Sequence, residues 1–182
     1  MAQPQPVSAP DDAVLIAAWR DGDEQAAAEL VRRHARPLAR FLAGAGAPES
    51  ELDDLVQETF IRAFRSVDRF RGHCQFRTWL MAIGSNVLKD FGRRIARRQI
   101  MPLDEGVRDT RGDPHEHAEA AEAETLLAEG LLQLSRLQRE VFLLRAQQGL
   151  DYEEIAAALA TTPGAARVHY HHAVQRLKEI VA

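Results

Sequence analysis

Three histidines, His169, His171 and His172, lie within four positions near the C-terminus, in the stretch PGAARVHYHHAVQRLKE. Imidazole can bind a metal ion, transfer a proton or, when protonated, face a phosphate. A metal site on one helix usually pairs histidines at i and i+4, whereas this spacing gives only an i, i+3 pair with no cysteine or acidic run beside it. His115 and His117 also lack partners. We therefore expect no metal site and no cofactor, and we interpret the C-terminal histidines as a solvated or phosphate-facing stripe.

The helix that carries these histidines has a separate apolar face. Ala166, Tyr170, Ala173 and Leu177 recur at i, i+4, i+7 and i+11, which predicts a buried stripe. The histidines lie off that stripe, alongside basic residues. They are therefore predicted to lie outside the core.

The segment before this helix completes the pattern of a helix-turn-helix. We expect a short helix at Tyr152–Leu159, a turn at 160–163 with the sequence ATTP, and a second helix that opens near Gly164. In this motif the second helix enters the major groove, and its first residues meet base edges and phosphates. Any antiparallel helix pair with a tight turn has the same layout, so the motif alone leaves that alternative open.

A second group of residues with recognisable chemistry is aromatic and basic. The stretch SVDRFRGHCQFR, residues 66–77, loses the helical period and predicts a loop rich in Phe and Arg. Aromatic rings and guanidinium planes stack on exposed bases. The helix expected at about 78–98 ends in a basic cluster that suits phosphates. This cluster consists of Lys89, Arg93, Arg94, Arg97 and Arg98.

The composition favours an all-α fold with two small helical domains. The 182 residues are 46% hydrophobic but only 6% aromatic, and alanine, a strong helix former, supplies much of the apolar share. The net charge of −4 hides a basic segment, an acidic segment and a neutral one. We expect a tail and short helix at 1–23, a basic domain at 24–98, a flexible acidic linker at 99–125 and a second domain at 126–182.

The spacing of apolar residues places the remaining helices. Ser50 is the expected N-cap of a strongly amphipathic helix that begins with ELDDL. The other expected helices are Asp12–Arg20, one from Glu24 to about 43, and four short ones at about 123–134, 136–147, 151–159 and 164–180.

Cysteine usage and apolar runs indicate the compartment. The one cysteine, Cys74, excludes an internal disulfide and fits a reducing environment. No apolar run approaches the roughly 20 residues of a membrane span, and the N-terminus does not resemble a secretory signal. We expect a cytoplasmic protein. Cys74 is interpreted as incidental, with redox sensing as the alternative.

These motifs together resemble a bacterial RNA polymerase sigma factor. The resemblance rests on DDLVQETFIRAF (53–64), FRGHCQFRTWLMAIGSNVLKDFGRR (70–94) and the helix-turn-helix that follows an acidic linker. It is strongest to the extracytoplasmic-function (ECF) group of the sigma-70 family, which keeps only the sigma-2 and sigma-4 domains. It implies a sigma-2 helical bundle at 24–98 and a sigma-4 helix-turn-helix at 126–182.

The resemblance implies that the polar face of the helix at 53–64 binds the clamp of the polymerase's largest subunit. Carboxylates and an amide on a rigid helix suit an arginine-rich partner helix. Without the family, a solvated helix face would be the default interpretation. The implied core-binding residues are Asp53, Asp54, Gln57, Glu58 and Arg62.

It also implies that the loop at 66–77 and the helix after it read the minus-ten element, with one base of the non-template strand flipped into a pocket. Trp79 is expected to be a core anchor instead. The implied minus-ten residues are Phe70, Arg71, Gln75, Phe76, Arg77, Asn86, Lys89, Arg93, Arg94 and Arg97.

The sigma-4 domain is expected to read the minus-thirty-five element and to bind the flap of the second-largest subunit through apolar positions around Leu137, Val141 and Leu144. Histidines stand where arginine is common in its recognition helix, which reduces its fixed charge. A second departure lies in the sigma-2 domain, where GSN (84–86) stands in place of the common ARN and Ser85 loses a cation, which would alter promoter contacts. The implied minus-thirty-five residues are Thr162, Gly164, Arg167, Val168, His169, His171, His172 and Arg176.

We therefore expect a sigma factor that has no active site of its own and binds core polymerase and promoter DNA, both duplex and single-stranded. The resemblance also implies an anti-sigma factor as a partner. The alternative is a helix-turn-helix regulator that acts without being a polymerase subunit, although no dimerisation or ligand domain is evident. Motifs of metallohydrolases, serine hydrolases and phosphate-binding loops are absent from the sequence.

Overall fold

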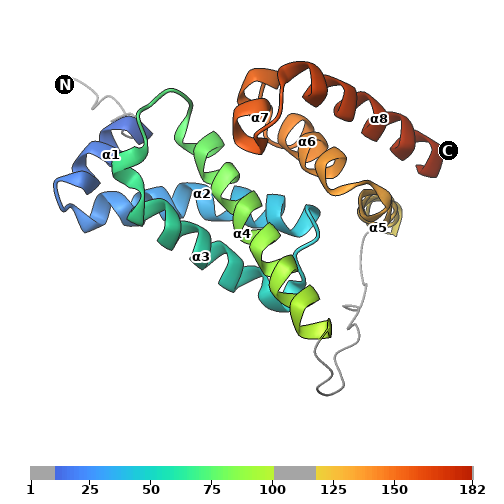
Figure 1. The fold of residues 1–182 in the computed structure, drawn as a ribbon, viewed down its shortest axis with the longest axis horizontal. Helices are drawn as coiled ribbons and strands as arrows, with labels where there is room; N and C mark the ends of the chain where they lie inside the picture. The colour runs from blue at the N-terminus through green and yellow to red at the C-terminus, as the bar shows by residue number, and fades with distance from the viewer. Residues whose placement is uncertain (1–10, 101–117, 182) are drawn as a thin grey trace, which may run out of the picture.

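The computed structural model describes residues 11–100 and 118–181, and every regular element within them is helical (Figure 1). The expected all-α fold is confirmed for these residues. The elements are α1 (Asp12–Arg20), α2 (Glu24–Gly44), a 3-10 turn η1 (Glu49–Glu51), α3 (Leu52–Arg65), a 3-10 turn η2 (Val67–Arg69), α4 (Phe76–Ile100), α5 (Ala118–Gln133), α6 (Arg136–Ala146), α7 (Tyr152–Leu159) and α8 (Pro163–Val181).

Helices α1 to α4 form the N-terminal half. The carboxylate of Asp23 caps α2 by accepting hydrogen bonds from the Gln25 and Ala26 amides at 2.9 and 3.3 Å. From there α2 buries one continuous face against α3 and α4. The buried face includes Leu30, Leu38, Phe41 and Leu42, each 0% exposed.

Gly84 lets α4 cross close to α2. A Cβ at this position would lie 2.9 Å from Cδ1 of Leu38 and 3.6 Å from Cγ2 of Thr59. The glycine of the GSN stretch therefore has a packing reason, because a side chain there would force the two helices apart.

Helices α5 to α8 form the C-terminal half, and local signals define their ends. Ser135 with Gln138 and Asp151 with Glu154 form capping boxes that begin α6 and α7. Helix α7 ends at Leu159, and the next residue, Ala160, caps it in the left-handed conformation with φ of 52°. The predicted apolar stripe of α8 is confirmed: Ala166, Ala173 and Leu177 are buried, and the ring of Tyr170 stacks on that of Phe142 at 6.0 Å.

The two halves pack against each other, and their buried apolar side chains form one continuous cluster. Helix α4 lies against α7, and α2 lies against α6 (Figure 1). At the α2–α6 contact a Cβ on Gly44 would lie 2.9 Å from Cδ2 of Leu143, so the helices approach closely there. Arg139 of α6 donates a hydrogen bond to the Ala45 carbonyl at 3.1 Å.

The α4–α7 contact and its surroundings contain polar pairs. Thr78 donates to Glu154 at 3.1 Å, and Arg77 donates to the Gln148 carbonyl. The buried hydroxyl of Ser85 donates to the carboxylate of Glu140 at 3.1 Å. These bonds link residues that are 55 to 76 positions apart in the sequence.

Four predicted boundaries were wrong. Ser50 lies inside the 3-10 turn η1 and does not cap α3. Helix α4 begins at Phe76, two residues before the predicted start, and extends to Ile100, whereas α5 begins at Ala118. Both helices therefore enter the predicted linker. The predicted N-terminal tail (1–10), the flexibility of residues 101–117 and the histidines His115 and His117 lie outside the described residues.

Candidate nucleic-acid and protein interfaces

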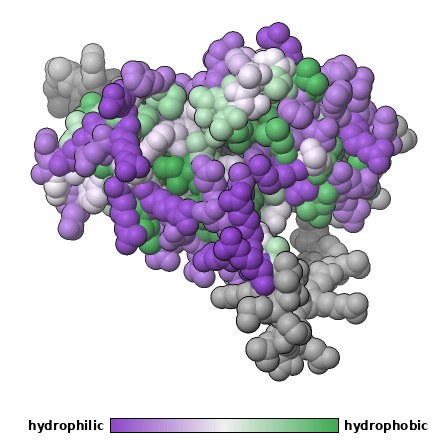
Figure 2. All heavy atoms as spheres, viewed as in Figure 1, coloured by the Kyte–Doolittle hydropathy of each residue, from purple (hydrophilic) through white to green (hydrophobic). Residues whose placement is uncertain are grey.

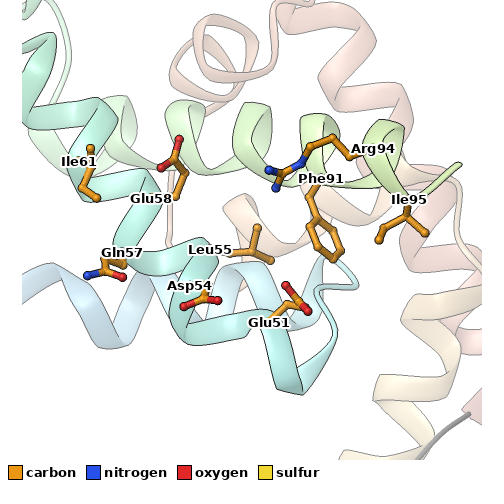
Figure 3. Close-up of a pocket in the computed structure, with 9 residues that line it drawn as sticks. All are labelled: Glu51, Asp54, Leu55, Gln57, Glu58, Ile61, Phe91, Arg94 and Ile95. Atoms are coloured by element: carbon orange, nitrogen blue, oxygen red, sulfur yellow. The ribbon is translucent and has the colours of Figure 1, made fainter. Parts of the chain in front are cut away.

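The polar face of α3 lies between two grooves. Asp53, Asp54 and Gln57 are exposed on it, as an interface would require. A groove of about 490 Å³ lies between α3 and the C-terminal part of α4 (Figure 3). It is lined by Glu51, Asp54, Leu55, Gln57, Glu58, Ile61, Phe91, Arg94 and Ile95. A second groove of about 440 Å³ is lined by Val31, Asp53, Asp54, Val56, Gln57, Phe60, Ile61 and Phe64.

The other two residues of the predicted core-binding set, Glu58 and Arg62, are paired with each other. Arg62 donates to Glu58 at 2.7 Å and to Asp90 of α4 at 2.8 Å. These bonds raise the pKa of Arg62 and lower the pKa of Asp90. Arg62 therefore links α3 to α4. The exposed acid and amide groups of the face come from Asp53, Asp54 and Gln57.

The predicted base-reading segment contains an aromatic cluster. The ring of Phe70 lies 5.2 Å from that of Trp79 and 5.9 Å from that of Phe76. Phe76 is only 3% exposed, so its ring belongs to the core in this arrangement and is not available for stacking on a base. Trp79 is half-buried in the same cluster, in line with an anchoring role. Arg71 and Gln75 are exposed.

Two further members of the predicted minus-ten set make contacts within the chain. Arg77 donates to the Gln148 carbonyl of the C-terminal half. The amide of Asn86 is exposed and donates to the Ala82 carbonyl at 3.0 Å.

The basic cluster lies on the C-terminal half of α4, where Figure 2 shows strongly hydrophilic side chains. Lys89, Arg93, Arg94 and Arg97 are all exposed there. The guanidinium of Arg94 lies 5.8 Å from the centre of the Phe91 ring, at the edge of the α3–α4 groove. Four cations on one helix form a surface suited to the phosphates of a duplex.

Helix α8, the predicted recognition helix, exposes most of its predicted DNA-contacting residues. Arg167, Val168, His171 and His172 are exposed, as are Gly164 and Arg176. The Thr162 hydroxyl caps the helix by accepting a hydrogen bond from the Ala165 amide at 3.1 Å. The guanidinium of Arg167 lies 5.1 Å from the centre of the Tyr152 ring, and Arg176 pairs with Glu179 at 3.0 Å.

His169 differs from the other two histidines. It is half-buried, and its Nδ1 is buried without a hydrogen-bond partner among the described residues. The imidazoles of His171 and His172 are exposed. The stripe therefore consists of these two rings, with His169 at its edge.

Of the three apolar positions predicted to hold the polymerase flap, Leu137 is half-buried and the other two do not reach the surface. Val141 and Leu144 are 0% exposed, because they pack in the core of the C-terminal half. That prediction was wrong for these two residues. The exposed large apolar side chains of this half are Leu126, Leu127, Leu132 and Val168.

Two residues that sequence reasoning missed are Arg20 and Glu140. Arg20 donates to the Val67 and Phe70 carbonyls. Glu140 is 1% exposed and accepts from Arg136 at 2.7 Å as well as from Ser85; burial raises its pKa, and Arg136 partly offsets this effect. A sequence signal existed for Glu140, since it lies four positions before the core residue Leu144.

Within residues 11–100 and 118–181, no group of three or more His, Cys, Asp or Glu side chains is placed to hold a metal ion. None of the helices described there is long and apolar enough to cross a membrane.

Comparison with known proteins covers both halves. Residues 30–98 match the family Sigma-70 region 2, and residues 125–177 match Sigma-70, region 4. The chain is 36% identical over 160 residues to the RNA polymerase sigma factor NccH of Alcaligenes xylosoxydans xylosoxydans, covering 83% of this chain and 84% of NccH. It is 30% identical over 167 residues to the ECF RNA polymerase sigma-E factor of Haemophilus influenzae, covering 86% of this chain and 87% of that factor.

A solved structure shows the same arrangement of helices. CnrH in complex with the cytosolic domain of CnrY superposes with a TM-score of 0.71 at 30% identity, covering 93% of this chain and 96% of CnrH.

Proposed function

We propose how the residues described above act in a chain that belongs to the sigma-70 family of RNA polymerase sigma factors, in its ECF group. A sigma factor binds core RNA polymerase and promoter DNA; the chemistry belongs to the polymerase. The observation that carries the residue-level proposal is that exposed acids gather beside two grooves on α3, whereas exposed cations gather on the C-terminal half of α4, with Arg94 at the edge between the two faces. Since polymerase and chromosome lie in the cytoplasm, we place the protein there.

The α3 face is proposed to bind the polymerase. Asp53, Asp54 and Gln57 lie exposed beside two grooves whose walls are partly apolar. A helix of mixed basic and apolar character fits such a surface, because charged pairs fix its orientation and apolar side chains fill the grooves. Glu58 and Arg62 support this face through their link to α4.

The segment from Phe70 to Arg77 and the basic half of α4 are proposed to bind the minus-ten region. Arg71 and Gln75, both exposed, are proposed to meet an unpaired base, and the neighbouring Phe70–Trp79 ring pair is proposed to supply apolar contacts. Lys89, Arg93 and Arg97 hold the phosphates of the adjoining duplex. Phe76 supports the segment from within the core.

The first turns of α8 are proposed to enter the major groove at the minus-thirty-five element. Arg167 is the permanent cation nearest the helix start, and the adjacent Tyr152 ring orients its guanidinium. Val168 offers an apolar contact to a thymine methyl group. His171 and His172 face the phosphates.

The packed arrangement of the two halves is proposed to open on the promoter. The two elements are about 25 base pairs apart, or ~85 Å of duplex at 3.4 Å per base pair. Residues 101–117 join α4 to α5, and any chain segment of that length can reach ~60 Å when extended. A connection of this length allows the two halves to move apart. Opening also releases Arg77 from Gln148.

A regulator of the anti-sigma class is proposed as a further partner. CnrH was solved in complex with the cytosolic domain of CnrY. We propose that this chain is held by a protein segment of the same kind, which competes with the polymerase.

Transcription by purified core polymerase, with and without the protein, tests the proposal on genomic fragments that include its own upstream region. Discrete new transcripts are expected. Asp54→Arg is expected to reduce them about 10-fold or more by placing a cation against an arginine-rich partner. The matched control is Glu49→Arg, an exposed acid of η1 outside both grooves. Equal activity of the two variants would contradict the assignment of the α3 face.

A further inference from the structure

Helix α1 lies before the part of the chain that matches Sigma-70 region 2, which begins at residue 30. It nevertheless contacts the segment proposed to read the minus-ten element. Its last residue, Arg20, donates hydrogen bonds from Nη2 to the Val67 carbonyl at 2.7 Å and to the Phe70 carbonyl at 2.5 Å. One guanidinium nitrogen therefore fixes both ends of the turn that leads into the base-reading segment.

The turn held by Arg20 determines where the exposed part of that segment starts. Val67 is buried, and Phe70 anchors its ring on Trp79. Residues 71–73 then follow in exposed positions, with Gly72 at a φ of +72°. The backbone of Phe70 is the last point fixed before the exposed residues, so its position sets that of Arg71.

The rest of α1 is anchored firmly enough for Arg20 to act as a brace. Leu15 and Ile16 are buried in the core, and the ring of Trp19 packs on that of Phe64 at 5.1 Å. At the other end of the helix, Asp12 binds Nε2 of His34 at 2.7 Å.

The partner of Asp12 leads to the far end of the same segment. The ring of His34 contacts the ring of Phe76, edge to face, at 5.3 Å. Phe76 begins α4 and closes the segment that Phe70 opens. Helix α1 is thus connected to both ends of residues 70–76, directly through Arg20 and indirectly through Asp12 and His34.

We propose that Arg20 is a positioning residue for minus-ten recognition: by holding the Val67 and Phe70 carbonyls, it places residues 71–75, of which 71–73 and Gln75 are exposed, to receive an unpaired base. Helix α1 then contributes to the recognition of single-stranded DNA. This inference rests on the proposed function of residues 70–77, and it goes beyond that proposal because Arg20 itself touches no DNA.

The test uses the full chain with Arg20→Gln, and Arg36→Gln as a control that removes an exposed arginine of α2. In the free protein, hydrogen exchange of the amides of residues 67–75 should become at least about 5-fold faster in R20Q, while α2 and α3 keep their protection. Unchanged exchange at 67–75 would overturn the proposal whether or not the chain acts as a sigma factor.

The second readout uses holoenzyme and the promoter found by transcription, in intact form and with the minus-ten region pre-melted by mismatches. R20Q should bind the pre-melted promoter about 10-fold more weakly than wild type, with unchanged affinity for core polymerase. Arg20→Lys, which keeps the cation but not the planar fork, should give an intermediate loss. Equal affinity of R20Q and wild type, or an equal loss of core binding, would show that Arg20 has no specific role in positioning.

Discussion

The two surfaces proposed to bind DNA differ in how many permanent cations they gather. The basic half of α4 exposes Lys89, Arg93, Arg94 and Arg97, whose cations persist at any physiological pH. Helix α8 exposes Arg167, Lys178, an Arg176 that is paired with Glu179, and two histidines. The first surface gathers four cations on one half of a helix, whereas the second has one cation near its start and imidazoles after it. The difference teaches that the two surfaces are suited to different shares of the electrostatic attraction to a phosphate backbone.

The largest expected effect comes from preventing the two surfaces from separating. Thr78→Cys with Glu154→Cys, in a Cys74→Ser background, replaces side chains whose terminal oxygens lie 3.1 Å apart across the halves. Once the two thiols are joined by a short, reducible bis-maleimide, the pair should hold the closed arrangement and lower transcription from a duplex promoter by about 100-fold or more. Reduction of the linker should restore activity, and each single cysteine variant serves as a control. Full activity of the cross-linked protein would show that the promoter is read without opening.

Removing fixed charge from α4 should have the next largest effect. Arg93→Gln with Arg97→Gln should weaken duplex binding about 50-fold near 0.1 M salt, and the slope of log affinity against log salt should fall by about 2. Binding is measured by fluorescence anisotropy across a salt series. Arg40→Gln, an exposed arginine of α2, should leave the slope unchanged. A slope that does not move in the double variant would mean that these cations touch no phosphates.

Adding fixed charge to α8 should give a smaller effect in the opposite direction. His172→Arg should bind a minus-thirty-five duplex about 5-fold more tightly than wild type near 0.1 M salt, because it adds a permanent cation at a position proposed to face phosphates. Gln25→Arg adds the same charge in α2 and should leave the affinity unchanged. Equal affinity of His172→Arg and wild type would show that position 172 faces no phosphate.

The smallest effect concerns Glu140, a buried residue at the contact between the two halves. Burial raises its pKa, so the folded protein binds this proton more tightly than the unfolded chain does. The free energy of unfolding should therefore fall as the pH rises from the ordinary glutamate value of 4.5 through the raised value. Glu140→Gln should remove this slope, seen as a change of a few degrees in the pH dependence of Tm. An identical slope in both proteins would assign the pH dependence to other groups; Glu153→Gln, an exposed acid of α7, is the control.

Local signals predicted the C-terminal half better than the loop of the N-terminal half. The sequence predicted a short helix, a turn at 160–163 and an apolar stripe from Ala166 to Leu177, all of which are short-range features. The structure has helices α7 and α8 where these features indicate. The start of α4 was missed because Phe76 joins the helix through burial in the core and contact with His34, which are tertiary effects.

The candidate site residues also divide into those that local sequence predicts and those that only the fold brings together. Exposure of Asp54, Arg93 and Arg167 follows from the polar faces of amphipathic helices, which periodicity predicts. Burial of Val141 and Leu144 could also have been expected from their pattern, but the resemblance directed them toward a partner. The bonds from Arg20 to residues 47 and 50 positions away leave no mark in local sequence, so only the fold brings them together.

The close approach of Gly44 to Leu143, within the continuous apolar cluster, has a consequence for how the molecule melts. Because side chains from both halves complete the same dry core, neither half keeps all of its buried surface when the other is lost. Their unfolding is therefore coupled, and calorimetry on the free chain should show a single cooperative transition. A fragment that ends at residue 100 would leave the partners of Leu143 in solvent and melt at a lower temperature than the same residues do in the full chain.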